Sequence, residues 1–290
     1  MAAIEFTARL AESLRVRGLD LTVPFAVQVY NAAVPSAFAL PTFGHGRTLG
    51  ILVANSRALW PAFTTFVRAH PDHVRESNPL DRYVTLMVDQ ALADARAGCS
   101  VALETAAEIR HSWETAPGRM VAIQRLCTVS GLAALDEASH LCVHAEFGPW
   151  IALRTAIVLH LPMPPELERP AAVNPVPPVL VPYLTRILHR LVPPGTHYHM
   201  QVQSDRDDDK NPDTLEGLNE YSLALIAEND ARAARNDPAS WRDWLLMRDL
   251  AASWMGRSRA MAARYTDEAL QYHYTKETII LAGIINGGGR

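Results

Sequence analysis

Arg154 is the residue whose surroundings point most directly to chemistry. It interrupts the apolar run IALRTAIVLHL, residues 151–161, where an unpaired charge would be costly. A guanidinium group presents its donors as a fixed fork, which matches the oxygens of a carboxylate or a phosphate. Two hypotheses are therefore open: Arg154 binds an anionic ligand, or it forms an internal ion pair with Glu104 or Glu146.

A second candidate is a metal site built from histidines. His197 and His199 are separated by one residue and would lie on one face of a strand, and His144 could join them from a neighbouring strand. The acidic stretch 204–213 follows directly, so a strand end that leads into a solvated loop explains the same residues. We keep the metal site as an alternative only. Cys142, near His144, is expected to be a small buried hydrophobe.

Aromatic and charged residues are dense in the segment WRDW, residues 241–244, and Arg248 follows shortly after. Arginine and tryptophan together can hold a flat ligand or an anion. A helix that packs Trp241 and Trp244 while its charges pair in water explains the same pattern. The residues by themselves favour that second interpretation.

The composition excludes several functional classes. The net charge is −4, and no basic stripe of the kind that binds nucleic acid is present. Three cysteines without a CxxC motif argue against a disulfide framework and a thiolate zinc site. No apolar run approaches the roughly 20 residues that span a bilayer, and the N-terminus lacks the apolar core of a signal peptide. We expect a cytoplasmic protein without membrane contact.

Hydrophobic periodicity predicts helices that alternate with short strands. The expected helices cover residues 1–17, 57–69, 79–97 and 120–134. The expected strands cover residues 21–23, 48–55, 100–104, 141–144 and 150–161. Layers of helices and strands of this kind indicate an α+β or α/β fold.

The composition changes at Pro162, and three ranges are predicted on that basis. Residues 1–161 form the core. Residues 162–237 form a proline-rich and acidic insertion, because proline runs favour extended conformations and cannot form regular sheet. Residues 238–290 are helical in character and complete the core.

Three separated segments carry a resemblance to a known family. The segment LCVHAEFGPWIALRT, residues 141–155, matches the pattern V-C-I-H-P-x-F-G-G-W-F-A-I-R at Cys142, His144, Phe147, Gly148, Trp150, Ala152 and Arg154. The segment PFAVQVYNAAVPSAFALP, residues 24–41, matches at Pro24, Phe25, Val27, Tyr30, Asn31, Pro35, Ala37, Phe38, Leu40 and Pro41. The third is the WRDW segment. On these matches the chain resembles the cblC-type cobalamin-processing proteins.

The resemblance implies an α+β fold of the flavin-nitroreductase type, with a mixed sheet flanked by helices. It implies an enzyme that binds cobalamin and removes its upper axial ligand. An alkyl group passes to the thiolate of glutathione, and cyanide leaves after reduction by a flavin, FMN or FAD. Arg154 matches a family arginine that holds the carboxylates of glutathione, and Arg248 corresponds to a second. The family's corrin-contacting segment after Gly131 is replaced here by LAALDEASH, residues 132–140.

Further residues and partners follow from the same resemblance. The candidate cofactor-binding residues are Cys142, His144, Phe147, Trp150, Trp241, Trp244 and Thr128, the last at the position of a family histidine. The partners that the resemblance implies are a flavin reductase, a cobalamin-acceptor protein and a second copy of the chain. Two alternatives stay open: a metal- or flavin-dependent oxidoreductase on the same scaffold, and a non-catalytic cobalamin carrier.

Overall fold

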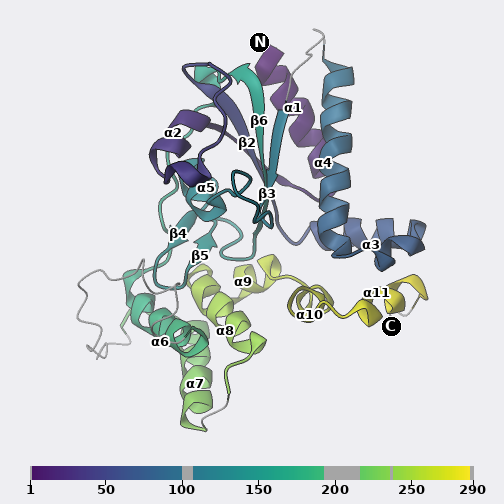
Figure 1. Ribbon diagram of the computed structural model, residues 1–290. Helices are drawn as coiled ribbons and strands as arrows, with labels where there is room; N and C mark the ends of the chain where they lie inside the picture. Colours follow the sequence, from purple (N-terminus) through teal and green to yellow (C-terminus); the bar gives the residue numbers. More distant parts are fainter. Residues whose placement is uncertain (1, 100–106, 193–215, 236–237, 288–290) are drawn as a thin grey trace. The chain divides into compact units, whose positions relative to one another are not determined.

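The computed structural model describes residues 2–99, 107–192, 216–235 and 238–287 (Figure 1). The chain forms two compact units. The first unit combines Met1–Leu132, Ile151–Ala172 and Tyr265–Arg290, and the second combines Ala133–Trp150 and Val173–Arg264. These units do not coincide with the three predicted ranges. Leu141 and Val143 pack in one hydrophobic cluster with residues of the stretch that was predicted as an insertion, which places residues 133–150 in the second unit.

The first unit is built on an antiparallel sheet of four strands. Its strands are β1 (Leu21–Ala26), β2 (Thr48–Asn55), β6 (Ala152–Pro162) and β3 (Ala107–His111), in that order across the sheet. Every pairing is antiparallel. All eight residues of β2 are buried, as expected for a central strand covered on both faces. The predicted α+β class is confirmed, and the described part of this sheet contains no parallel pair.

The edge strand β1 is fixed in register by a close contact with its neighbour. Phe25 pairs with Gly50 of β2, and a Cβ atom added to Gly50 would lie 2.3 Å from Cζ of the Phe25 ring. The ring therefore occupies the space that any other side chain at position 50 would need. Pro24, which has no backbone N–H, is tolerated because β1 lies at the edge of the sheet.

Helices cover the sheet of the first unit. In Figure 1 α1 (Ala2–Arg15) and α4 (Pro79–Gly98) lie side by side next to the strands. Phe6, Leu10 and Leu14 of α1 are buried in one hydrophobic cluster with residues of α4 and β2. The same cluster contains residues of α3 (Leu59–Ala69), α10 (Asp267–Thr275) and α11 (Thr278–Ile285). The first unit also contains the short helices α2 (Val27–Ala32) and α5 (Ile123–Val129).

The second unit packs a two-stranded hairpin with helices. Its elements are β4 (Ala134–Asp136), β5 (Leu141–Val143), α6 (Val181–Leu191), α7 (Glu220–Ala234), α8 (Trp241–Ala252) and α9 (Arg257–Ala263). Single turns of 3₁₀-helix occur in both units at Ser36–Phe38, Pro71–Arg75, Pro165–Leu167, Pro178–Leu180 and Ser253–Met255. Asp243 at the start of α8 is buried and contacts Arg190 of α6 and Arg232 of α7. One carboxylate thus joins three helices.

Two local predictions were wrong. The predicted helix over 120–134 is shorter, because α5 ends at Val129 and Gly131 has a φ of 77°, which lies outside the right-handed helical region. Within the proline-rich stretch, residues 181–191 form the helix α6 instead of an extended chain, with Pro182 in its first turn, where a missing N–H costs nothing. The predicted strand 100–104 lies outside the described residues. No helix in the described ranges is both long enough and apolar enough to cross a membrane.

Candidate functional site

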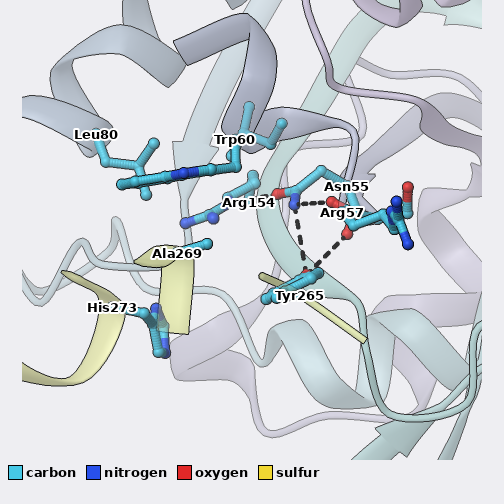
Figure 2. A pocket seen from close by; sticks show the side chains of 10 residues that line it. Asn55, Arg57, Trp60, Leu80, Arg154, Tyr265, Ala269 and His273 are labelled. Atoms are coloured by element: carbon cyan, nitrogen blue, oxygen red, sulfur yellow. Dashed lines mark hydrogen bonds between the residues drawn. The ribbon is translucent and has the colours of Figure 1, made fainter. Parts of the chain in front are cut away.

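A small pocket in the first unit lies where β2 ends. Its walls include Asn55 and Arg154 from the strands, Trp60 from α3, and Tyr265 and His273 from the C-terminal segment (Figure 2). The pocket has a cavity volume of about 30 Å³. Since a cavity of about 10–15 Å³ holds one water molecule, the pocket has room for a group the size of a carboxylate. It is too small for a whole cofactor.

A β-bulge places Arg154 in this pocket. Val53 pairs with Thr155 and Ala54 pairs with Leu153, so Arg154 is the extra residue between two cross-strand pairs. Bulges bend a strand locally and change the direction of a side chain. On the other edge of β6, Ser112 N donates a 2.8 Å hydrogen bond to Arg154 O. The backbone at this bulge is therefore held from the neighbouring strand.

The side chain of Arg154 is oriented by Asn55. Arg154 Nε donates a 2.7 Å hydrogen bond to Asn55 Oδ1. Asn55 Nδ2 donates to Ser56 O at 2.7 Å, and Tyr265 Oη donates to Asn55 O at 3.3 Å. In Figure 2 the guanidinium extends from Asn55 into the pocket, on the side of Trp60 and Ala269. One arginine is thus held at Nε while its terminal nitrogens face the pocket.

Arg154 is buried with a neutral partner. Burial lowers the pKa of its guanidinium, and the negative charges that Tyr265 and Asp81 can carry act in the opposite direction. Among the described residues Arg154 makes no ion pair. Glu104, one of its two predicted partners, lies outside the described residues, and Glu146 belongs to the second unit. The hydrogen bond that the structure gives Arg154 is to an amide.

A second cation acts on the same region. Lys276 follows α10 and its Nζ lies 5.7 Å from the ring centroid of Tyr272. Burial lowers the pKa of its ammonium group, Asp81 raises that pKa, and the positive charge of Arg154 lowers it. The positive charges of Lys276 and Arg154 therefore repel each other, although the side chain of Lys276 is exposed and is not among the residues that line the pocket.

In the second unit, Trp150 is fully buried and contacts two arginines. The Cζ atoms of Arg248 and Arg264 lie 5.6 and 5.5 Å from the centroid of its rings. Arg248 Nη1 donates a 3.0 Å hydrogen bond to Pro149 O, and Arg264 Nε donates to Asp249 Oδ1 at 3.2 Å. Arg248 thus contacts Trp150 and the residue before it, and both tryptophan–arginine contacts are within the range of cation–π interactions.

Comparisons with known proteins bear on the family. No family model matches the chain. A protein from Bos taurus named cyanocobalamin reductase / alkylcobalamin dealkylase is 29% identical over 190 residues, which make up 60% of this chain and 64% of that protein. The structure of the B12-trafficking protein CblC from C. elegans, described as a homologue of human MMACHC, has a TM-score of 0.64 and covers 100% of this chain and 98% of its own, at 14% identity. The chain resembles the cblC-type proteins.

The sequence similarity supports the predicted resemblance, and the C. elegans structure supports the fold. The match spans less than two thirds of the length of the bovine protein. The two arginines predicted from the cblC-type resemblance lie in different units, Arg154 in the first and Arg248 in the second. Both stay predicted catalytic residues.

The predicted cofactor-binding residues of the cblC-type motif lie mostly in the second unit. Cys142 is buried on β5, where it pairs with Leu135. His144 Nδ1 accepts hydrogen bonds from the backbone N–H groups of Glu146 and Phe147, at 3.0 and 3.2 Å. The ring of Phe147 lies 5.1 Å from that of His144. The motif therefore folds as a tight turn between β5 and Trp150.

The other predicted cofactor-binding residues lie on helices. Trp241 and Trp244 are half-buried on α8; Trp244 packs against the hydrophobic cluster of the second unit, and Arg242 lies 5.4 Å from the ring of Trp241. Thr128 lies on α5 of the first unit and its Oγ1 donates to Gln124 O at 3.4 Å.

Of the three histidines of the alternative metal site, only His144 lies among the described residues. His144 Nδ1 accepts the two backbone hydrogen bonds just described, while His197 and His199 lie outside the described residues. In the ranges that the structure describes, no group of three or more histidine, cysteine or acidic residues could hold a metal ion.

Sequence reasoning missed three residues that shape the Arg154 pocket. Asn55 is the last residue of the predicted strand 48–55 and Trp60 lies within the predicted helix 57–69, but neither was predicted as a site residue. Tyr265 lies in the range 238–290, which was predicted only as helical in character. Asn55 and Trp60 lie more than 90 positions before Arg154 and Tyr265 lies more than 100 positions after it, so no local pattern joins them. The one available signal was a polar residue, Asn55, at the end of a mostly apolar strand.

Proposed function

We propose that this protein binds cobalamin and removes its upper axial ligand. The proposal is supported by the similarity to the bovine protein of that name over 190 residues and by the cblC-type motif around Arg154. The observation that carries it is the placement of Arg154. The bulge and Asn55 present a buried, positively charged fork to a pocket that fits a carboxylate.

The co-substrate that suits this pocket is a small thiol with carboxylates, such as glutathione. In the proposed dealkylation the thiolate sulfur attacks the carbon bound to cobalt. A carbon–sulfur bond forms, the cobalt–carbon bond breaks, and its electron pair stays on cobalt. Arg154 takes no part in these bond changes. It binds a carboxylate of the thiol through paired, charge-assisted hydrogen bonds and so fixes the distance between sulfur and carbon.

The remaining assignments follow the resemblance. Arg248 is proposed as a second anion contact, and Cys142, His144, Phe147, Trp150, Trp241, Trp244 and Thr128 as residues near cobalamin. Removal of cyanide needs electrons, for which a reduced flavin supplied by a flavin reductase is the proposed source. A cobalamin-acceptor protein and a homodimer are proposed partners.

Visible spectroscopy tests the proposal in two steps. Hydroxocobalamin is added to the purified protein at micromolar concentration, and a change in its absorbance bands is expected on binding. Methylcobalamin is then incubated with the protein and glutathione in the dark, and loss of the methyl ligand with formation of S-methylglutathione is expected. No spectral change in the first step would reject cobalamin binding altogether.

A carrier that binds cobalamin without changing it is the second candidate. The B12-trafficking role named for the C. elegans protein favours it. The second step separates the two candidates, because a carrier binds methylcobalamin and leaves its methyl group in place whether or not glutathione is present.

A further inference from the structure

The partner of Arg154 is neutral, and its orientation is fixed. Asn55 is buried. Its Nδ2 donates to Ser56 O, which can only accept, and its Oδ1 accepts from Arg154 Nε, which can only donate. Both neighbours have a defined polarity, so the amide has one orientation that satisfies them. Tyr265 Oη adds a 3.3 Å hydrogen bond to the carbonyl of the same residue.

This arrangement determines which donors of Arg154 are available. A guanidinium can bind a carboxylate through Nε and one terminal nitrogen, or through its two terminal nitrogens. Asn55 uses Nε. The two terminal nitrogens are then the pair that remains for a carboxylate, and they face the pocket in Figure 2.

The neutrality of Asn55 has a second consequence. Aspartate has nearly the same shape and would offer Arg154 Nε an acceptor in the same place, but the two would form a buried ion pair. An ion pair neutralises the positive charge that an anionic ligand needs, and the ligand would have to compete with the internal carboxylate. An amide provides the same geometry and leaves the charge in place.

We infer that Asn55 is a positioning residue that orients Arg154 and, because it is neutral, reserves the charge of Arg154 for a ligand carboxylate. The inference rests on the proposed function of Arg154 as an anion contact. It assigns Asn55 two separable effects: the direction of the guanidinium and the preference of the pocket for an anionic over a neutral ligand.

Calorimetry with two related probes measures that preference. S-methylglutathione keeps both carboxylates but has no thiol that could react, and its diethyl ester has no free carboxylate. Binding of each probe is measured with and without bound methylcobalamin. The dissociation constant of the ester divided by that of S-methylglutathione is the preference ratio, and a ratio above one reports recognition of the carboxylates. A general loss of structure would weaken the binding of both probes and leave this ratio unchanged.

The variants are Asn55→Asp, Asn55→Ala, Arg154→Ala and Asn286→Asp. Asn55→Asp is expected to weaken S-methylglutathione at least about tenfold, the loss of one charge-assisted contact, and to leave the ester unchanged, so the ratio falls towards one. Asn55→Ala keeps the charge but loses the orientation, and a smaller fall is expected. Asn286→Asp adds the same charge at an exposed position of the first unit and should leave the ratio at the wild-type value.

The outcomes separate the inference from the proposed function. If Arg154→Ala keeps the wild-type ratio, Arg154 is not the anion contact and the proposed function of the pocket fails. If Arg154→Ala abolishes the preference but Asn55→Asp and Asn55→Ala both keep it, the pocket stands and the role of Asn55 is wrong. If Asn55→Asp does not fold, Asn55→Ala decides: an unchanged ratio overturns the inference.

Discussion

Arg154 Nε and Asn55 Oδ1 lie 2.7 Å apart although 99 positions of sequence separate the two residues. The hydrogen bond joins the end of β2 to the bulge in β6. It is formed by a buried cation and a buried amide, so each side chain satisfies a polar group that would otherwise be costly to bury. Replacing either residue is therefore expected to leave an unsatisfied hydrogen-bonding group, whereas breaking an ion pair would leave an unpaired charge.

Arg154→Ala is expected to abolish glutathione-dependent removal of the methyl group while the protein still folds. The substitution leaves Asn55 Oδ1 without its donor, which costs about 1–3 kcal/mol of the free energy of unfolding. Arg154→Lys keeps the charge but not the fork, and an intermediate rate is expected. Thermal melts and dealkylation rates measure the two effects. A stability loss of about 3–5 kcal/mol would instead indicate a broken buried ion pair.

Gly50→Ala is expected to destabilise the first unit through Phe25. The new Cβ would lie 2.3 Å from Cζ of the ring, and overpacking of this kind costs about 1–3 kcal/mol. In a Phe25→Leu background the same change should cost less, and the difference measures their coupling. Gly46→Ala is the control, since nothing lies within 4 Å of the position that its new methyl group would take. Equal costs of Gly50→Ala in both backgrounds would contradict the contact.

His111 is expected to make stability fall below pH 6.5. Burial lowers the pKa of its imidazole from the ordinary value of 6.5, with Glu114 and Asp89 acting in the opposite direction. Well above pH 6.5 the imidazole is neutral in both the folded protein and the unfolded chain. Below it the unfolded chain binds a proton before the folded protein does, so the free energy of unfolding decreases until the folded pKa is reached.

The substitution His111→Asn tests this pH dependence. The amide can replace the 2.8 Å hydrogen bond between His111 Nδ1 and Thr155 Oγ1 and has no proton to gain. Melting temperatures of the wild type and the variant are recorded from about pH 8 to about pH 5, a range that spans the ordinary histidine pKa. The variant should lose less stability than the wild type over this range, and parallel curves would refute the assignment.

Asp243→Asn is expected to destabilise the second unit strongly. Asp243 is 1% exposed and contacts Arg190 and Arg232, whose side chains are 20% and 18% exposed. Its loss removes the buried carboxylate of these two ion pairs, at a cost of about 3 kcal/mol, the lower end of the range for a broken buried pair. The matched control is Asp230→Asn. Asp230 pairs with Arg186 at the surface, where the two side chains are 52% and 43% exposed, and a pair of this kind contributes about 0–1 kcal/mol. Urea unfolding compares the two variants.

The acid sensitivity of Asp243 has a defined sign. Burial raises the pKa of its carboxyl group, but the hydrogen bond from Ser240 N and the charges of Arg190 and Arg232 outweigh burial and lower it below the ordinary 3.8. Its contribution to stability is therefore complete above pH 3.8 and is lost as the pH falls through the folded pKa. The wild type should lose stability more steeply than Asp243→Asn in this acid range.

Much of the fold could be predicted from local pattern. The strand 48–55 was predicted at its observed bounds, because it is a short apolar run between turn residues. The helix 79–97 agrees with α4 to within a residue, because it has a clear start at Asn78 and Pro79 and a stop at Gly98. The helix α6 was missed since proline composition suggested an extended chain. Its Pro182 lies in the first turn, and composition cannot distinguish that position from a helix interior.

The candidate site, like the fold, could be predicted from the sequence only in part. The sequence by itself determined that Arg154 is a buried cation in an apolar strand and that its surroundings resemble the cblC-type motif. Only the tertiary structure decided where that cation points and what it contacts. Strand alternation assigns a residue to one face of a sheet, but the bulge at Arg154 interrupts that alternation. Its partner Asn55 comes from a strand 99 positions away, and the pairing of distant strands, not any local pattern, brings the two together.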